Sequence, residues 1–229
     1  MNTLVKVVRY HLVSRAQYVL LPVGVTAFAF LVNLVIFAIV PTPQAGSFSG
    51  GLVTLYIFLF VSGVLSVTMS LPFGFTLGLS RRSYYLGTIL LVLVLGAVYS
   101  LGITVLQAVE GAVGGWGLSL HFFRIPWFLD GAWYLTWLTS FVLLVLVFVY
   151  GMWFGLVYRR WDVTGLVVFI ATQVVVLLAA ALITTWVEAW PAIGDFFTTL
   201  TALGLTAVLA AIAAALALGG FTTMRRVTV

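Results

Sequence analysis

One short polar stretch reads Gly78-Leu79-Ser80-Arg81-Arg82-Ser83-Tyr84-Tyr85-Leu86-Gly87, and it lies between two long apolar runs. A single arginine near the centre of a bilayer costs at least about 2.5–3.5 kcal/mol. The adjacent pair Arg81 and Arg82 therefore requires a water interface. The apolar runs on either side of the pair are then predicted to be helices that enter a membrane.

The composition of the whole chain supports the same class. Of its 229 residues, 64% are hydrophobic and 7% are charged, and the mean hydropathy is +1.26. A soluble domain would carry roughly 25% charged residues. We therefore expect an all-α polytopic membrane protein that forms a single transmembrane domain over residues 1–229.

Apolar runs of about the 20 residues needed to cross a bilayer predict six transmembrane helices. They lie at about 18–40, 52–78, 86–109, 132–157, 164–187 and 198–220. The second run is long and contains Pro72, which predicts a kinked or tilted helix whose last turns approach the surface. A short turn at 79–86 joins the second helix to the third.

The basic residues determine the orientation. With the N-terminus inside, nine of the ten basic residues fall in cytoplasmic segments and only Arg124 falls outside. Short loops follow this positive-inside bias well. Both termini are therefore expected in the cytoplasm, and the turn at 79–86 is expected on the same side.

Residues 3–16 precede the first apolar run and have the pattern of a basic amphipathic helix. Leu4, Val5 and Val8 share a face, and Lys6 and Arg9 lie roughly opposite. Such a helix suits the headgroup layer of a membrane. The alternative is an ordinary positive flank that only orients the first span. In either case membrane lipids, rather than nucleic acid, are the expected counter-charge for the net +5.

Several kinds of chemistry have no residues to support them. The sequence has no cysteine, and its only lysine, Lys6, does not follow a glycine-rich loop, so no P-loop is present. His11 and His121 fall on opposite sides of the membrane and cannot share a metal ion. No nucleophile is paired with a base. We expect no metal site, no cofactor in this chain and no enzymatic activity of its own.

A few polar residues fall within the apolar runs. Residues of this kind join helices more often than they bind a substrate. Two glycine pairs, Gly74 with Gly78 and Gly151 with Gly155, match the G-x-x-x-G packing pattern. Because the chain has 22 glycines, chance produces such matches, and the pattern alone is a weak signal.

The polar turn carries a family resemblance. Phe75-Thr76-Leu77-Gly78-Leu79-Ser80-Arg81-Arg82-Ser83-Tyr84-Tyr85-Leu86-Gly87 is similar to the GxSRRxF/YxxG turn of small bacterial permeases of the type-2 ABC exporters. Arg225-Arg226-Val227 also resembles their short basic tails. The six spans, the inside termini and the amphipathic N-terminal helix match the architecture of that group.

The resemblance implies partners and a location in the bacterial cell membrane. Two permeases would pair, as a homodimer or a heterodimer, and each would recruit a cytoplasmic ATP-binding subunit that holds ATP and Mg. The turn would be a coupling element that docks on that subunit, and the N-terminal helix would contact it as well. The implied contact residues are Ser80, Arg81, Arg82, Tyr84 and Tyr85 in the turn and Lys6 and Arg9 in the N-terminal helix.

The function expected from the resemblance is an ATP-driven exporter permease for an amphipathic or hydrophobic cargo. Candidate contacts in the cavity of the dimer are Asn33, Ser62, Ser66 and Gln173. One alternative is a non-transporting membrane scaffold or assembly factor, and another is an uncoupled channel or secondary carrier.

Within the turn, Ser80 is expected to cap a short interfacial helix. The connection between the fifth and sixth spans is short for this family.

Overall fold

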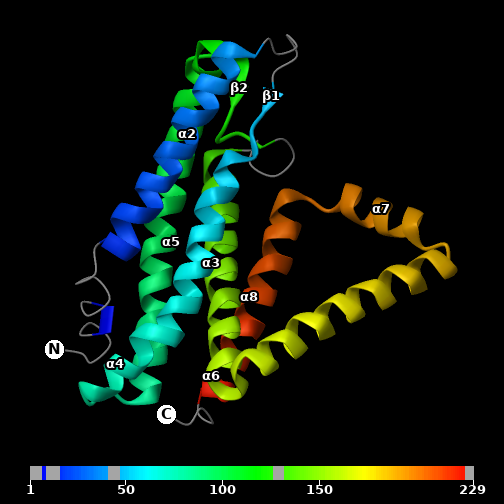
Figure 1. Cartoon of the computed structure of the whole chain (residues 1–229). Coiled ribbons are helices and arrows are strands. Elements are labelled where there is room, and N and C mark those ends of the chain that lie inside the picture. Colours follow the sequence, from blue (N-terminus) through cyan, green and yellow to red (C-terminus); the bar gives the residue numbers. More distant parts are fainter. Residues whose placement is uncertain (1–6, 9–15, 41–46, 126–131, 225–229) are drawn as a thin grey trace.

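The computed structural model describes residues 7–8, 16–40, 47–125 and 132–224, and most of these residues are helical (Figure 1). Within these ranges, five helical segments are long and apolar enough to cross a membrane. They span Ala16–Ile39, Gly50–Thr76, Arg81–Ala112, Trp133–Trp186 and Ala202–Met224. These segments are compatible with the expected all-α membrane class.

The named elements follow one another along these segments. The α-helices are α2 (Leu21–Ile39), α3 (Val53–Leu65), α4 (Leu71–Thr76), α5 (Arg81–Ala112), α6 (Trp133–Trp186), α7 (Trp190–Thr199) and α8 (Ala202–Met224). Two short strands of two residues each, β1 (Ser47–Phe48) and β2 (Leu120–His121), pair in parallel. Helix α5, which contains the third predicted span at 86–109, starts earlier than that span, at Arg81.

Helix α6 contains a sharp reversal at Asp162. The backbone of Asp162 is left-handed, with φ of 59°, and it interrupts the helical geometry there. We call the parts on either side the first arm (133–161) and the second arm (163–186), and their junction the elbow. In Figure 1 the second arm runs away from the bundle. Most side chains of the second arm are exposed.

The first arm of α6 is the centre of the bundle and packs against α3, α5 and α8. Glycines permit its closest approach to α3. A Cβ added to Gly151 would lie 2.1 Å from the carbonyl oxygen of Phe60, and one added to Gly63 would lie 2.2 Å from that of Phe148. Gly155 also faces α3, where a Cβ would lie 2.9 Å from the carbonyl oxygen of Val64. Small residues thus let the two backbones touch, as in other membrane helix pairs.

The kink predicted near Pro72 has a local cause. A π-helical turn at Ser66–Ser70 separates α3 from α4. Pro72 lacks the N–H that would bond the carbonyl of Thr68, so a regular α-helix cannot continue through this position. The chain then reaches the lower end of the bundle through α4 (Figure 1).

The connection between α6 and α8 is helical rather than a short loop. Helix α7 begins with Pro191 in its first turn, a position where proline is tolerated because no N–H partner is needed there. It crosses between the far end of the second arm and the start of α8 (Figure 1). Apolar side chains of α7, such as Phe196 and Phe197, are exposed.

Candidate functional site

The turn between α4 and α5 is a compact backbone structure. Gly78 has a φ of 76°, which a residue with a Cβ rarely adopts. The N–H of Leu79 donates to the carbonyl of Gly74 at 3.1 Å, and the N–H of Gly78 donates to that of Phe75 at 2.9 Å. This pair of bonds is a Schellman motif. Gly78 is therefore required to end α4, and Gly74 does not take part in a G-x-x-x-G helix contact with it.

Ser80 caps the helix that follows. Its side chain accepts a hydrogen bond from the N–H of Ser83 at 3.1 Å, and its backbone is extended, as at other N-caps. The expected capping role is thus confirmed, but the capped element is the long helix α5 rather than a short interfacial helix. The turn proper is confined to residues 77–80.

Arg81 and Arg82 occupy the first turn of α5, and both are exposed. Cations at a helix N-terminus oppose the helix dipole, at a cost of roughly 0.3–1 kcal/mol each. The helix dipole therefore gives no reason for two arginines at the start of α5. We call Ser80, Arg81 and Arg82 the Arg surface.

Tyr84 and Tyr85 point into the bundle. Their side chains are buried, and each hydroxyl donates to a backbone carbonyl of another element. Tyr84 reaches Ser66 in the π-helical turn at 2.5 Å, and Tyr85 reaches Ala217 in α8 at 2.6 Å. The two tyrosines proposed as partner contacts thus anchor the turn within this chain, and the exposed part of the predicted site is the Arg surface.

The N-terminal segment contacts the same end of α5. Val7 is buried, and a Cβ added to Gly87 would lie 2.5 Å from the Val7 Cβ. Lys6 and Arg9, the two predicted contacts of this segment, lie outside the described residues. Val7 nevertheless places part of the N-terminal segment one helical turn beyond the Arg surface.

The four predicted cavity residues occupy three separate places. Asn33 accepts a hydrogen bond from Ser49 at 2.6 Å and donates to Ala29 in its own helix. Ser62 in α3 and Ser66 in the π-helical turn are buried, and the Ser62 hydroxyl has no hydrogen-bond partner among the described residues. Gln173, on the second arm, accepts a hydrogen bond from Tyr150. A pocket at the elbow includes none of the four.

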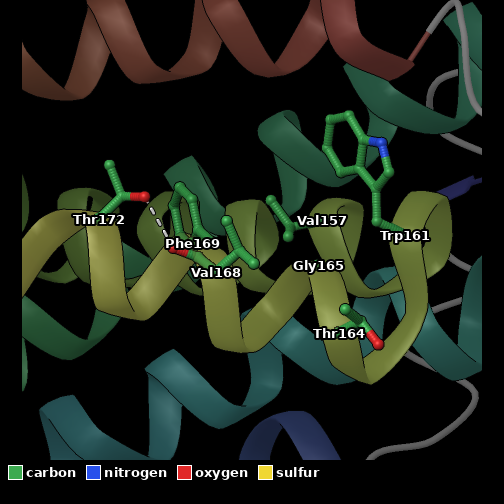
Figure 2. Close-up of a pocket in the computed structure, with 7 residues that line it drawn as sticks. All are labelled: Val157, Trp161, Thr164, Gly165, Val168, Phe169 and Thr172. Carbon is green, nitrogen blue, oxygen red and sulfur yellow. Dashed lines mark hydrogen bonds between the residues drawn. The ribbon is translucent and has the colours of Figure 1, made fainter.

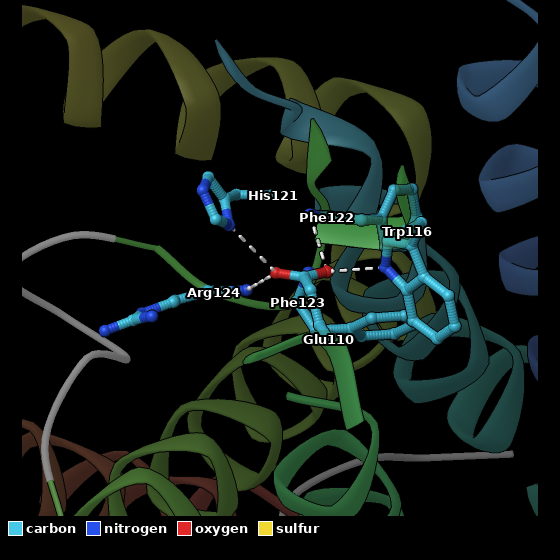
Figure 3. Close-up of polar contacts among 6 residues, drawn as sticks. All are labelled: Glu110, Trp116, His121, Phe122, Phe123 and Arg124. Carbon is cyan, nitrogen blue, oxygen red and sulfur yellow. Dashed lines mark hydrogen bonds and ion pairs between the residues drawn. The ribbon is translucent and has the colours of Figure 1, made fainter. Parts of the chain in front are cut away.

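A buried carboxylate at the other end of α5 accepts several hydrogen bonds. Glu110 is fully buried, and four N–H groups converge on it (Figure 3). Its Oε2 accepts from the Trp116 indole at 3.0 Å and from the backbone of Phe122 and Phe123 at 2.9 and 3.0 Å. Its Oε1 accepts from the backbone of Arg124 at 3.1 Å.

The Glu110 cluster fixes the connecting loop onto the bundle. His121 approaches Oε1 at 3.6 Å through its Nδ1, and the rings of Trp116, Phe122 and Phe123 pack around Phe30 of α2. The sequence showed Glu110 only as an acidic residue at the end of an apolar run. Nothing in the spacing of that run distinguishes a solvated loop acid from a buried one that binds four N–H groups.

Comparisons with models of known protein families, with curated proteins and with solved structures gave no significant match. The resemblance to exporter permeases therefore depends on the turn and the architecture alone. The functional argument below is built from the geometry of this chain.

Proposed function

We propose that this chain is the membrane-spanning permease subunit of an ATP-driven type-2 ABC exporter. Counting the two arms of α6 as separate spans gives the six helices of that architecture. The positive-inside bias favours a cytoplasmic side for the Arg surface and the elbow, and the resemblance of the turn to exporter permeases points to a bacterial cell membrane. The proposed cargo is amphipathic or hydrophobic, since the helices carry few charged residues.

The observation that carries the proposal is the mechanical connection of the Arg surface. Arg81 and Arg82 are exposed at the first turn of a 32-residue helix. Tyr84 and Tyr85 follow shortly after, and their hydroxyls donate hydrogen bonds to the π-helical turn and to α8. A force applied to the arginines therefore acts on α5, α8 and the end of α3 together. This is the property that a coupling element requires, because a partner must move several helices through one small contact.

In the proposed mechanism, a cytoplasmic ATP-binding subunit docks on the Arg surface and holds ATP and Mg. Nucleotide binding and hydrolysis move the docked turn, and the helices bonded to it transmit the motion to a cavity shared with a second permease. This chain contributes no group to the hydrolysis. The N-terminal segment, through Val7 against Gly87, is suited to form the edge of the same docking surface.

The test is co-purification from the bacterium that produces the protein. The tagged chain is extracted in mild detergent, and the bound material is assayed for ATP hydrolysis and for labelling with a photoreactive ATP analogue. The double variant Arg81→Glu with Arg82→Glu is compared with the matched variant Arg159→Glu with Arg160→Glu, which reverses the same charge at the elbow.

The proposal expects an ATP-binding subunit with the unmodified chain and with the elbow variant, and its loss only with the Arg-surface variant. An ATP-binding subunit that remains after reversal of Arg81 and Arg82 would contradict the docking role. Recovery of a partner that binds no ATP would support a scaffold or assembly factor instead.

A further inference from the structure

An open hollow of about 470 Å³ lies at the elbow of α6. Its lining is almost entirely apolar and comes from both arms: Val157, Trp161, Thr164, Gly165, Val168, Phe169 and Thr172. In Figure 2, Trp161 and Phe169 stand at either side of the hollow, with Val157 and Val168 between them. The volume falls within the roughly 300–1,000 Å³ of sites that hold small ligands.

The shape of the hollow depends on Gly165. A Cβ at this position would lie 2.1 Å from the Trp161 Cβ, so any larger residue would push the indole away. The left-handed backbone of Asp162 brings Trp161 over the start of the second arm. The hollow is thus a consequence of the reversal and not of a gap between separate helices.

Two arginines, Arg159 and Arg160, directly precede Trp161 at the elbow. Arg160 lies over the Trp161 ring at 4.5 Å, so the indole that lines the hollow also holds a guanidinium group. Within the described ranges, neither Arg159 nor Arg160 forms an ion pair. The two positive charges also fix the depth of the elbow, because they must remain at the level of water and headgroups.

We infer that the elbow binds an anionic phospholipid, with an acyl chain in the hollow and the headgroup phosphate on Arg159 and Arg160. The apolar lining matches a hydrocarbon chain, and arginine is suited to contact phosphate oxygens. An uncharged lipid would fill the hollow but leave the arginines without a counter-charge. This inference does not depend on the transport function proposed above.

The test is native mass spectrometry of the purified chain in detergent. The chain is titrated with detergent-solubilised phosphatidylglycerol or with detergent-solubilised phosphatidylcholine. Arg159→Gln with Arg160→Gln removes the headgroup contacts, and Arg81→Gln with Arg82→Gln is the matched control at the other turn. Val168→Trp fills the hollow, whereas Val167→Trp places the same side chain on an exposed neighbour that does not line it. Gel filtration and thermal melting establish that each variant is folded.

Phosphatidylglycerol is expected to bind the unmodified chain more tightly than phosphatidylcholine. Loss of the two elbow arginines should weaken phosphatidylglycerol binding by about 30-fold, and the Arg81 and Arg82 control should leave it nearly unchanged. Val168→Trp should reduce the binding of both lipids, unlike Val167→Trp. Equal affinity for the two lipids, or equal losses from the two arginine pairs, would overturn the proposal. If the arginine variant misfolds, equal binding by the two tryptophan variants would overturn it independently.

Discussion

The contact between α3 and the first arm of α6 leads to a sharp prediction for Gly151→Ala. The new methyl carbon would lie 2.1 Å from the carbonyl oxygen of Phe60, whereas ordinary contact begins near 3.4 Å. The two helices must therefore separate by about 1.3 Å along that line. On the other side of the same interface, Gly63 is equally close to Phe148, so the helices cannot simply tilt to relieve the contact.

The expected loss of stability is about 1–3 kcal/mol, which is typical of an extra methyl group forced into a packed interface. Loosening the interface also forfeits dispersion contacts, since a gap of 0.5–1 Å removes roughly a quarter to a half of each attraction. The matched control is Gly102→Ala in α5, where a Cβ meets nothing within 4 Å. In a helix interior that change is neutral or stabilises by up to about 1 kcal/mol.

The assay is reversible unfolding in mixed micelles with increasing sodium dodecyl sulfate, followed by circular dichroism. Gly151→Ala should unfold at a clearly lower detergent fraction than the unmodified chain, and Gly102→Ala should not. Equal unfolding midpoints for the two alanine variants would refute the close contact between α3 and α6.

Three further changes test the polar contacts at the two ends of α5. Glu110→Gln leaves one acceptor oxygen, which can keep the three donors of the Oε2 site, so the N–H of Arg124 should lose its acceptor at a cost of about 2–4 kcal/mol and exchange faster. Ser80→Ala should cost about 1 kcal/mol through loss of the helix cap, seen as faster exchange in the first turn of α5. Tyr85→Phe removes the bond to Ala217 and should cost about 0.5–1.5 kcal/mol in the same unfolding assay, whereas Tyr158→Phe, at an exposed position, should cost almost nothing.

Hydropathy and charge were sufficient to predict the class of the molecule and the approximate position of its helices. The cost of burying charge in lipid is large and local, so it leaves a clear pattern in the sequence. The reversal at Asp162 falls between two predicted spans for this reason, since Arg159 and Arg160 cannot enter the hydrocarbon. Pro72 likewise predicted an irregular helix, because a missing N–H has a local effect.

Contacts between distant segments could not be predicted in the same way. The two G-x-x-x-G matches look alike in the sequence, yet Gly151 and Gly155 face α3, whereas Gly78 ends a helix with a left-handed backbone. The difference depends on which residues oppose each glycine in space, and no periodicity within one helix contains that information.

The tyrosines of the turn illustrate the same limit. Aromatic residues beside an arginine pair suit a membrane interface, and the sequence favoured an exposed surface for Tyr84 and Tyr85. Their burial depends on the positions of Ser66 and Ala217, which lie in other helices. Glu110 is a comparable case, because its four donors come from a loop that folds back over the end of its own helix.

The most direct test of the proposed coupling role uses the absence of cysteine from the sequence. Leu77→Cys introduces a single thiol at an exposed position of the turn beside the Arg surface and leaves both arginines in place. A maleimide with a photoreactive group can then capture whatever docks there in native membranes. Val187→Cys, exposed just beyond the second arm, is the control. The coupling role predicts a cross-linked ATP-binding protein from position 77 and none from position 187. Capture of no ATP-binding protein at position 77, or of the same protein at both positions, would contradict it.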